Sequence, residues 1–282
     1  MLEASMVAIG DELLGGYVAD ANSPWLAQRL RSYGVPLSRV HVVPDEFAAI
    51  DEALQAELAR SRPRLVVTSG GVGSTPDDIT FEAVAASLGR DVVLHDELAA
   101  RLQPIADRTA TFGIDVDERF THHLLRMARL PSGSRLLTPP GSWVPAVAVD
   151  IDGGSAATGV TVLILPGVPE AFRSLVSNVV EPQLLAGHNP NERVEEITHS
   201  FPESVLNGMF EDLLRDSPAV KLGSYPGRPM IIRLTGPPDD VNRAAEQVRA
   251  HLQQLTDSPA GARLAASWAV RGQRANDAED AT

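Results

Sequence analysis

Short apolar runs alternate with longer amphipathic stretches through the first half of the chain, and this order restricts the fold more than any other feature. Strands are predicted at residues 5–10, 35–43 and 65–68, and helices at 22–33, 47–59 and 78–88. Because each strand is followed by a helix, the strands are expected to run parallel and to be joined by right-handed crossovers. The sequence therefore predicts a doubly wound α/β sheet.

The pattern of the first domain continues to about residue 188. Two helices are expected at 96–112 and 117–127, strands at 135–138, 146–151 and 160–165, a loop at 153–159 and a helix at 170–185. The following His-Asn-Pro-Asn, residues 188–191, is typical of a linker. The first domain is therefore assigned to residues 1–188.

A smaller domain is predicted at residues 192–256, where the order becomes strand, helix, strand, strand, helix. Its elements are expected at 194–200, 203–215, 220–225, 230–235 and 239–255. This order predicts a small α+β domain. Residues 257–282 are rich in Ala, Ser, Gly, Arg and Asp without periodicity, and a disordered tail is expected there.

The charge balance narrows the ligands that such a chain can hold. The formal net charge is −13 over 282 residues, and Lys221 is the only lysine. A duplex-reading surface needs clustered cations, and a Walker-type loop needs a lysine after its glycines, so neither is expected. An anionic ligand would have to be held by backbone N–H groups or by a divalent metal ion. Neither nucleic acid nor a membrane is expected as a partner.

The cysteine count and the hydropathy of the chain exclude further classes of site and protein. The absence of cysteine excludes a disulfide framework, a thiolate zinc site and a Cys nucleophile. No apolar run approaches the length of a membrane span, and no basic leader is seen, so a cytoplasmic protein is expected.

The glycine-rich segment 68–80, Thr-Ser-Gly-Gly-Val-Gly-Ser-Thr-Pro-Asp-Asp-Ile-Thr, is the sharpest functional feature. It lies between a predicted buried strand and a predicted helix. Glycines let the backbone approach a ligand closely, and a helix start adds free N–H donors, so the segment predicts a phosphate-binding loop. The residues expected to bind are Gly70, Gly71, Val72, Gly73, Ser74 and Thr75. The alternative is a structural turn in which Asp77 or Asp78 caps the helix.

Two further acidic turns follow predicted strands. Gly10, Asp11 and Glu12 end the first strand, and Asp45 follows the second. Ligands of open α/β sheets bind at the carboxyl ends of strands, so these carboxylates are expected to converge with Asp77 and Asp78 at one edge. The alternative for Asp45 is that it N-caps the next helix.

Other candidates are weaker. His122 and His123 lie in a polar helix, where a solvated face is favoured over metal ligation. Residues 166–170, Pro-Gly-Val-Pro-Glu, could line a pocket or form a rigid turn. No G-x-S-x-G motif supports a serine hydrolase, and Lys221 is expected on the surface of a strand.

Together these motifs resemble the MoaB/Mog-type molybdopterin-binding fold, in its CinA N-terminal subfamily. The resemblance lies in Gly10–Leu14, Asn22-Ser23, Pro44-Asp45, Gly70–Thr80 and Leu165–Glu170, in matching order over residues 5–185. Residues 193–255 are similar to the small second domain of CinA-like proteins and to the corresponding part of FAD synthase. The amidase domain of CinA has no counterpart, so deamidation of nicotinamide nucleotides is not expected.

The resemblance implies a three-layer α/β/α domain that forms a dimer or trimer. It also implies that Asp45 and Asp78 hold a divalent metal and act in catalysis. The phosphate or nucleotide is expected on the loop Gly70–Thr75, aided by Gly10, Asp11, Asn22 and Gly167. Relatives usually have Gly-Pro-Thr where this chain has Gly73-Ser74-Thr75, so the loop loses the fixed φ of a proline.

Three functions follow as hypotheses. The first is a nucleotide pyrophosphatase that uses Mg²⁺ (or Co²⁺ or Mn²⁺) to release AMP from an ADP-ribose- or FAD-like diphosphate. There, Asp77 or Glu12 would orient the attacking water. The alternatives are a protein that binds molybdopterin or its adenylylated form, and a scaffold without catalytic activity.

Overall fold

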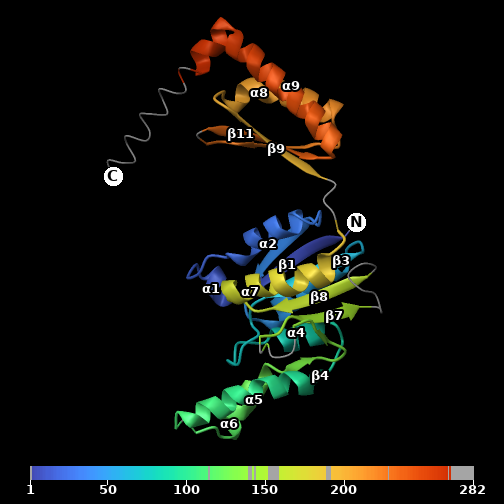
Figure 1. Cartoon of the computed structure of the whole chain (residues 1–282), viewed down its shortest axis with the longest axis vertical. Helices are drawn as coiled ribbons and strands as arrows, with labels where there is room; N and C mark the ends of the chain where they lie inside the picture. The colour runs from blue at the N-terminus through green and yellow to red at the C-terminus, as the bar shows by residue number, and fades with distance from the viewer. Residues whose placement is uncertain are drawn as a thin grey trace, which may run out of the picture. The chain divides into compact units, whose positions relative to one another are not determined.

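The computed structural model describes residues 2–113, 115–138, 142, 144–151, 159–188, 192–227, 229–265 and 267. The chain forms two compact units, Met1–Asn189 and Pro190–Thr282 (Figure 1). Most of the predicted loop 153–159, the predicted linker residues 189–191 and the predicted tail beyond residue 267 lie outside the described residues.

A six-stranded sheet forms the centre of the first unit, in the order β2-β1-β3-β8-β7-β6. The parallel part consists of β1 (Glu3–Ile9), β2 (Leu37–Val43), β3 (Arg64–Ser69) and β8 (Val160–Leu165). The remaining strands, β7 (Val147–Ile151) and β6 (Arg135–Leu136), are antiparallel. A parallel β7–β8 pair would need a crossover of a dozen or more residues, and Ile151 and Val160 are too close in sequence for one.

Helices cover both faces of this sheet, which confirms the α/β/α class. On one face pack α2 (Asn22–Arg31), α7 (Pro169–Leu175) and the π-helix η1 (Val176–Leu185) (Figure 1). On the other face pack α3 (Phe47–Leu58) and α4 (Thr80–Ser87). Successive residues of β1 alternate between the two cores, because Met6 and Ala8 face the first and Val7 and Ile9 the second.

The single helix predicted at 170–185 is therefore an α-helix followed by a π-helix. Pro182 lies inside η1 and has no N–H to donate to the preceding turn. The wider π-helical turns still bury Val176, Val179 and Val180 against the core.

Residues 92–131 form an extension of the first unit, called the arm here (Figure 1). It contains α5 (Asp96–Thr111), α6 (Glu118–Arg126) and a two-stranded antiparallel sheet of β4 (Val92–Leu94) and β5 (Arg129–Pro131). The two helices were predicted and the two strands were not. Strands of three residues are too short to show an alternating pattern.

The second unit is a three-stranded antiparallel sheet with helices packed on it. The strands β9 (Arg193–His199), β10 (Lys221–Tyr225) and β11 (Met230–Gly236) have the order β10-β11-β9. The helices α8 (Glu203–Asp216) and α9 (Pro238–Asp257) share one core with Ile232 and Leu234. Residues 259–265 are helical again, and Leu264 packs against this core, whereas the sequence predicted a disordered tail from residue 257. No helix among the described residues is long and apolar enough to cross a membrane.

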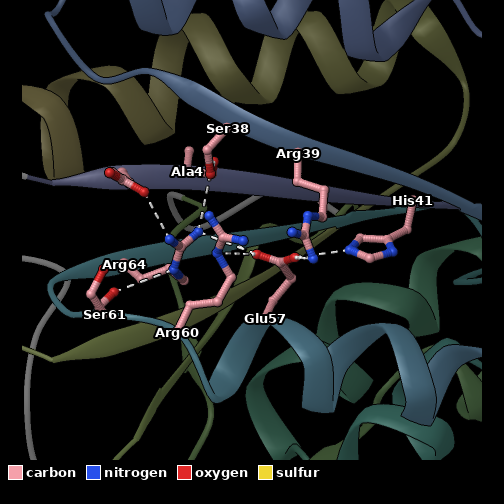
Figure 2. Close-up of polar contacts among 9 residues, drawn as sticks. Ala4, Ser38, Arg39, His41, Glu57, Arg60, Ser61 and Arg64 are labelled. Carbon is pink, nitrogen blue, oxygen red and sulfur yellow. Dashed lines mark hydrogen bonds and ion pairs between the residues drawn. The ribbon is translucent and has the colours of Figure 1, made fainter.

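A buried ion pair connects β2, α3 and β3, the three elements around β1. The side chains of Glu57 and Arg64 have no exposed surface, and Arg64 Nη1 donates to Glu57 Oε2 at 3.2 Å. Figure 2 shows His41, Arg39 and Arg60 around the same carboxylate, with His41 Nε2 at 2.9 Å from Oε1. Burial alone would raise the pKa of Glu57, but the hydrogen bond to His41 and the charges of Arg60 and Arg64 outweigh it and lower that pKa.

We predict that Glu57→Gln destabilises the chain strongly, because the buried charge of Arg64 then keeps only the partly exposed Glu3 as an anionic partner. A loss of about 3 kcal/mol in the free energy of unfolding is expected at pH 7, measured by urea denaturation. Glu3→Gln is the matched control, because Glu3 also accepts from Arg64 but its side chain is 38% exposed. Its expected loss is below about 1 kcal/mol. Equal losses in both variants would contradict a special role for the buried pair.

The pair of Glu57 and Arg64 also predicts that the stability of the fold depends on pH. Since the folded pKa of Glu57 lies below its usual value of 4.5, ionised Glu57 stabilises the fold above that pH. This stabilisation is lost as the pH falls through the folded pKa. The difference in stability between the wild type and Glu57→Gln should therefore shrink below pH 4.5.

Candidate functional site

The carboxyl ends of the four parallel strands lie side by side at one edge of the sheet. Ile9 pairs with Val43, Ala8 with Ser69, and Ser69 with Leu165. The turns that follow are therefore adjacent, and their backbones are joined by hydrogen bonds from Gly10 N–H to Val43 O and from Gly70 N–H to Leu165 O. The turns that carry the predicted residues thus share one edge, called the strand-end site here.

Two of the glycines lie where the backbones of neighbouring turns approach closely. Gly70 has φ of 110°, and a Cβ there would lie 2.1 Å from the carbonyl oxygen of Ile9. A Cβ on Gly167 would lie 3.1 Å from the Cα of Gly70. The turns after β1, β3 and β8 can approach this closely only without side chains at these positions.

Asn22 connects two of these turns and does not cap its helix. Its Nδ2 donates to Ser69 Oγ at 3.1 Å and to Gly167 O at 2.8 Å. The helix start is capped by Asp20, whose Oδ1 accepts from the N–H groups of Asn22 and Ser23. Asn22 Oδ1 is buried and has no hydrogen-bond partner in the described part of the chain. The residue Asn22 borders a pocket of about 60 Å³ that Glu12, Ser69 and Gly167 also line.

Asp45 lies at the centre of a crowded acidic group. Its Oδ2 accepts a hydrogen bond from the N–H of Asp11 at 3.0 Å, and it makes no cap for α3. Burial raises the pKa of Asp45, and the negative charges of Asp11, Glu12 and Asp77 raise it further, against the opposing effect of the Asp11 N–H. Asp11, Glu12 and Asp77 therefore lie close enough to Asp45 to raise its pKa, as their predicted convergence at one edge requires.

Asp78 has a different role in the glycine-rich loop. Its Oδ2 accepts from the backbone N–H of Thr75 at 2.8 Å and from the Thr75 hydroxyl at 2.6 Å. A Cβ on Gly73 would lie 2.6 Å from the same oxygen. The helix α4 begins only at Thr80, so Asp78 closes the loop and does not cap the helix.

The loop is held at its two ends by different residues. Thr80 binds its start, with Oγ1 donating to Gly70 O at 2.8 Å and N–H to Gly71 O at 2.9 Å. Arg126 of α6 binds its end, donating to the carbonyl oxygens of Thr75 and Asp78, each at 2.9 Å. The sequence contained no sign of this role for Arg126, because it lies about 50 residues from the loop in another element.

The loop residues between these anchors differ in environment. Val72 packs against the core below the loop. The neighbouring polar groups of the loop, Thr75 foremost, and the charge of Arg126 lower the pKa of Asp77, which therefore stays ionised. The backbone N–H groups of Gly73 and Ser74 make no hydrogen bond to another described residue.

The predicted metal pair is divided between these two environments. Asp45 contacts Asp11, and Asp78 contacts Thr75. Within the described ranges, no three His, Asp or Glu side chains are grouped to hold a metal ion. The metal site at Asp45 and Asp78 stays a prediction.

Both histidines of α6 were predicted to lie on a face exposed to solvent, and this prediction is wrong for His123. His122 is exposed, but His123 is partly buried, and its Nδ1 has no hydrogen-bond partner among the described residues. His123 lines a second and larger cavity that also includes Gly73 and Ser74.

In open α/β sheets, ligands bind at the carboxyl ends of the strands, and a glycine loop before a helix is a common place for an anionic group. Residues 5–186 match the family described as a probable molybdopterin binding domain, and the chain belongs to this family. The resemblance to CinA N-terminal-like proteins of the MoaB/Mog fold is thereby confirmed.

Two known proteins and one solved structure are similar to this chain. A protein of Pyrobaculum calidifontis is 31% identical over 80% of this chain and 81% of its own length. A CinA-like protein of Mycobacterium sp. strain MCS is 35% identical over 76% of this chain, and the match spans half of that relative. The crystal structure of the protein CinA, of unknown function, from Thermoplasma acidophilum is 28% identical, with a TM-score of 0.52 over 65% of this chain and 97% of that one.

We predict that Asp45→Asn makes the fold more stable at pH 7. The folded pKa of Asp45 is raised, so its ionised form is disfavoured by folding, and this penalty is present at any pH well above the folded pKa. Asparagine removes the charge and can still accept from the Asp11 N–H. A gain of roughly 0.5 kcal/mol, or about 1–2 °C in Tm, is expected by calorimetry. A decrease in Tm would show that the carboxylate is needed for the fold.

Proposed function

We propose that the chain binds a phosphorylated pterin of the molybdopterin type at the strand-end site. Membership of the molybdopterin-binding domain family supports the ligand class. The observation that carries the proposal is the glycine loop, in which the N–H groups of Gly73 and Ser74 make no hydrogen bond to another described residue.

The loop is suited to a phosphate because its donors are already arranged. Thr80 and Arg126 hold the two ends of the segment, so little ordering is required when a ligand binds. The N–H groups of Gly73 and Ser74 and the Ser74 hydroxyl would donate to the phosphate oxygens. The net charge of −13 makes such local donors necessary, because no general basic field attracts an anion. Gly10 and Gly167 would set the distance between neighbouring turns.

We predict that the chain binds a fluorescent pterin monophosphate and that inorganic pyrophosphate competes with it. Ser74→Glu should weaken binding at least tenfold, because it places a carboxylate beside the phosphate. Asn178→Asp is the control, since it adds the same charge at an exposed position of η1. Fluorescence anisotropy measures both variants. Equal affinity of the two variants would contradict a phosphate at this loop.

A second candidate is hydrolysis of an ADP-ribose- or FAD-like diphosphate, and the crowding around Asp45 favours it. Several carboxylates beside a phosphate loop repel an anionic ligand unless a divalent cation lies between them. Carboxylate oxygens are the donors that Mg²⁺ prefers, so Asp45 and Asp78 would be its ligands, and the cation would neutralise charge on the diphosphate. Asp77 or Glu12 would orient the attacking water.

This second function predicts that AMP is released from ADP-ribose or FAD with Mg²⁺, Co²⁺ or Mn²⁺ and not with chelator. Asp45→Asn should abolish the release while the fold is retained. Asp78→Asn should do the same, although it also disturbs the contact with Thr75. Chromatography of AMP measures the rate. No release under any condition, with pterin binding intact, would leave binding as the function.

A further inference from the structure

The six-stranded sheet of the first unit has one long open edge, called the β2 edge here. Among the described strands, β2 is hydrogen-bonded only to β1, and it runs for 7 residues from Leu37 to Val43. The opposite edge strand, β6, has only 2 residues. Very short strands, prolines and lysines are common means of preventing a further strand from pairing with an edge. Because β2 contains neither proline nor lysine, its edge is open to another strand.

The backbone groups of Val40 and Val42 point away from β1. Val43 O accepts a hydrogen bond from Gly10 N–H, so the polar backbone groups of Val43 face β1. Since the N–H and C=O groups of successive strand residues point to opposite sides, those of His41 also face β1, and those of Val40 and Val42 face outward. The outward groups make no backbone hydrogen bond to another described residue. They are the donors and acceptors that a paired strand would use.

One face of the β2 edge is apolar. Val40 and Val42 lie opposite Met6 and Ala8 of β1, so their side chains point to the face that α2 covers. Both valines nevertheless stay exposed, by 41% and 40%, and neither belongs to a core cluster. A strand paired with β2 would cover the two valines with its own side chains and remove this apolar surface from water.

The other face of the β2 edge is basic. In Figure 2, Arg39 and His41 of β2 point towards the carboxylate of Glu57. Arg60, just after α3, approaches the same carboxylate. Glu57 is fully buried and is shared with the buried Arg64, whereas the side chains of Arg39 and Arg60 are 47% and 30% exposed. The cations therefore lie at the surface and their anion lies beneath it, so an acidic side chain of a paired strand would meet guanidinium groups.

These charges favour an acidic partner over a second copy of the chain. If two copies paired through β2 about a two-fold axis, the cations of one edge would face those of the other, and like charges opposite each other are unfavourable. The net charge of −13 would oppose self-pairing and an acidic partner alike. That field is largely screened beyond about 8 Å at physiological ionic strength, so the contacts at the edge decide between the two.

We propose that the β2 edge binds an extended segment of a partner protein in which acidic and apolar residues alternate. The segment adds a strand to the sheet, and its backbone bonds to the outward groups of Val40 and Val42. Its apolar side chains pack on the two valines, and its carboxylates contact Arg39 and Arg60. The inference is independent of the pterin site, because no residue of the glycine-rich loop takes part.

Fluorescence anisotropy with labelled peptides tests the β2 edge on the unchanged full chain. The probe has blocked ends, the length of β2, and alternating glutamate and valine. We expect the chain to bind it and to bind a counterpart with lysine in place of glutamate about tenfold more weakly. Added salt should weaken binding of the glutamate peptide. Of two further peptides, N-methylated at every glutamate or at every valine, one should lose about tenfold in affinity, because it lacks the donors that face β2.

Variants of the chain place the peptide on β2. Val42→Pro should weaken binding about tenfold, because proline removes an outward N–H and leaves the hydrogen bonds to β1 intact. Val42→Thr is the matched control, since it keeps both the N–H and a branched side chain. Arg39→Gln should weaken binding about threefold. Arg119→Gln, which removes an exposed arginine of α6, should not change it. Thermal melts show that each variant is folded.

Three results would overturn the inference. One is that the wild-type chain does not bind the glutamate peptide or binds the lysine peptide equally well. Another is that a folded Val42→Pro variant binds as tightly as the wild type, or that both N-methylated peptides bind as tightly as the parent. The third is a wild-type dimer, seen by sedimentation equilibrium, that Val42→Pro dissociates, since a second copy would then occupy the β2 edge. If Val42→Pro does not fold, the N-methylated peptides decide, because they leave the chain unchanged.

Discussion

The buried pair of Arg64 and Glu57 is the constraint on which the site depends. Arg64 opens β3, Glu57 lies in the last turn of α3, and His41 of β2 contacts the same carboxylate. Two charges without exposed surface are tolerated only when they remain paired, so these elements cannot shift against each other at low cost. Because β2 and β3 flank β1, their carboxyl ends stay level with that of β1. The acidic turn, the glycine loop and Asp45 are adjacent for this reason.

The carboxylates at that edge perform two different tasks, although they are alike in sequence. Asp78 is satisfied by the N–H and hydroxyl of Thr75 and holds the loop in shape. Burial, and after it the charges of the acidic neighbours, raise the pKa of Asp45. A carboxylate whose charge destabilises the fold is typical of a functional position. Selection for stability alone would replace it with an uncharged residue. Asp45 is therefore the stronger candidate for contact with a ligand or cation.

Periodicity was sufficient to predict the parallel strands, their helices and the convergence of the strand ends, because each depends on local pattern and on general rules of α/β topology. Asn22 was expected at the site through the family resemblance, but its task of joining two turns was not predicted. A polar residue at a helix start is usually a cap, and Asp20 performs that task here. The contact of Arg126 with the loop and the place of His123 in a cavity wall were missed for another reason. Arg126 joins segments about 50 residues apart, and no spacing rule links an arm helix to a loop. The metal site depends on side-chain geometry that residue types alone do not specify.

The hydrogen bond between Asn22 and Gly167 joins residues 145 positions apart, and it also has a consequence for how the chain folds. The strands β1, β2 and β3 are close in sequence and can pair early, whereas β8 joins β3 only after the whole arm has been made. Long-range parallel pairing is slow because the intervening chain must lose its freedom first. The turn that carries Gly167 therefore reaches the edge late in folding, and a chain emerging from the ribosome would pair β1, β2 and β3 before this turn completes the strand-end site.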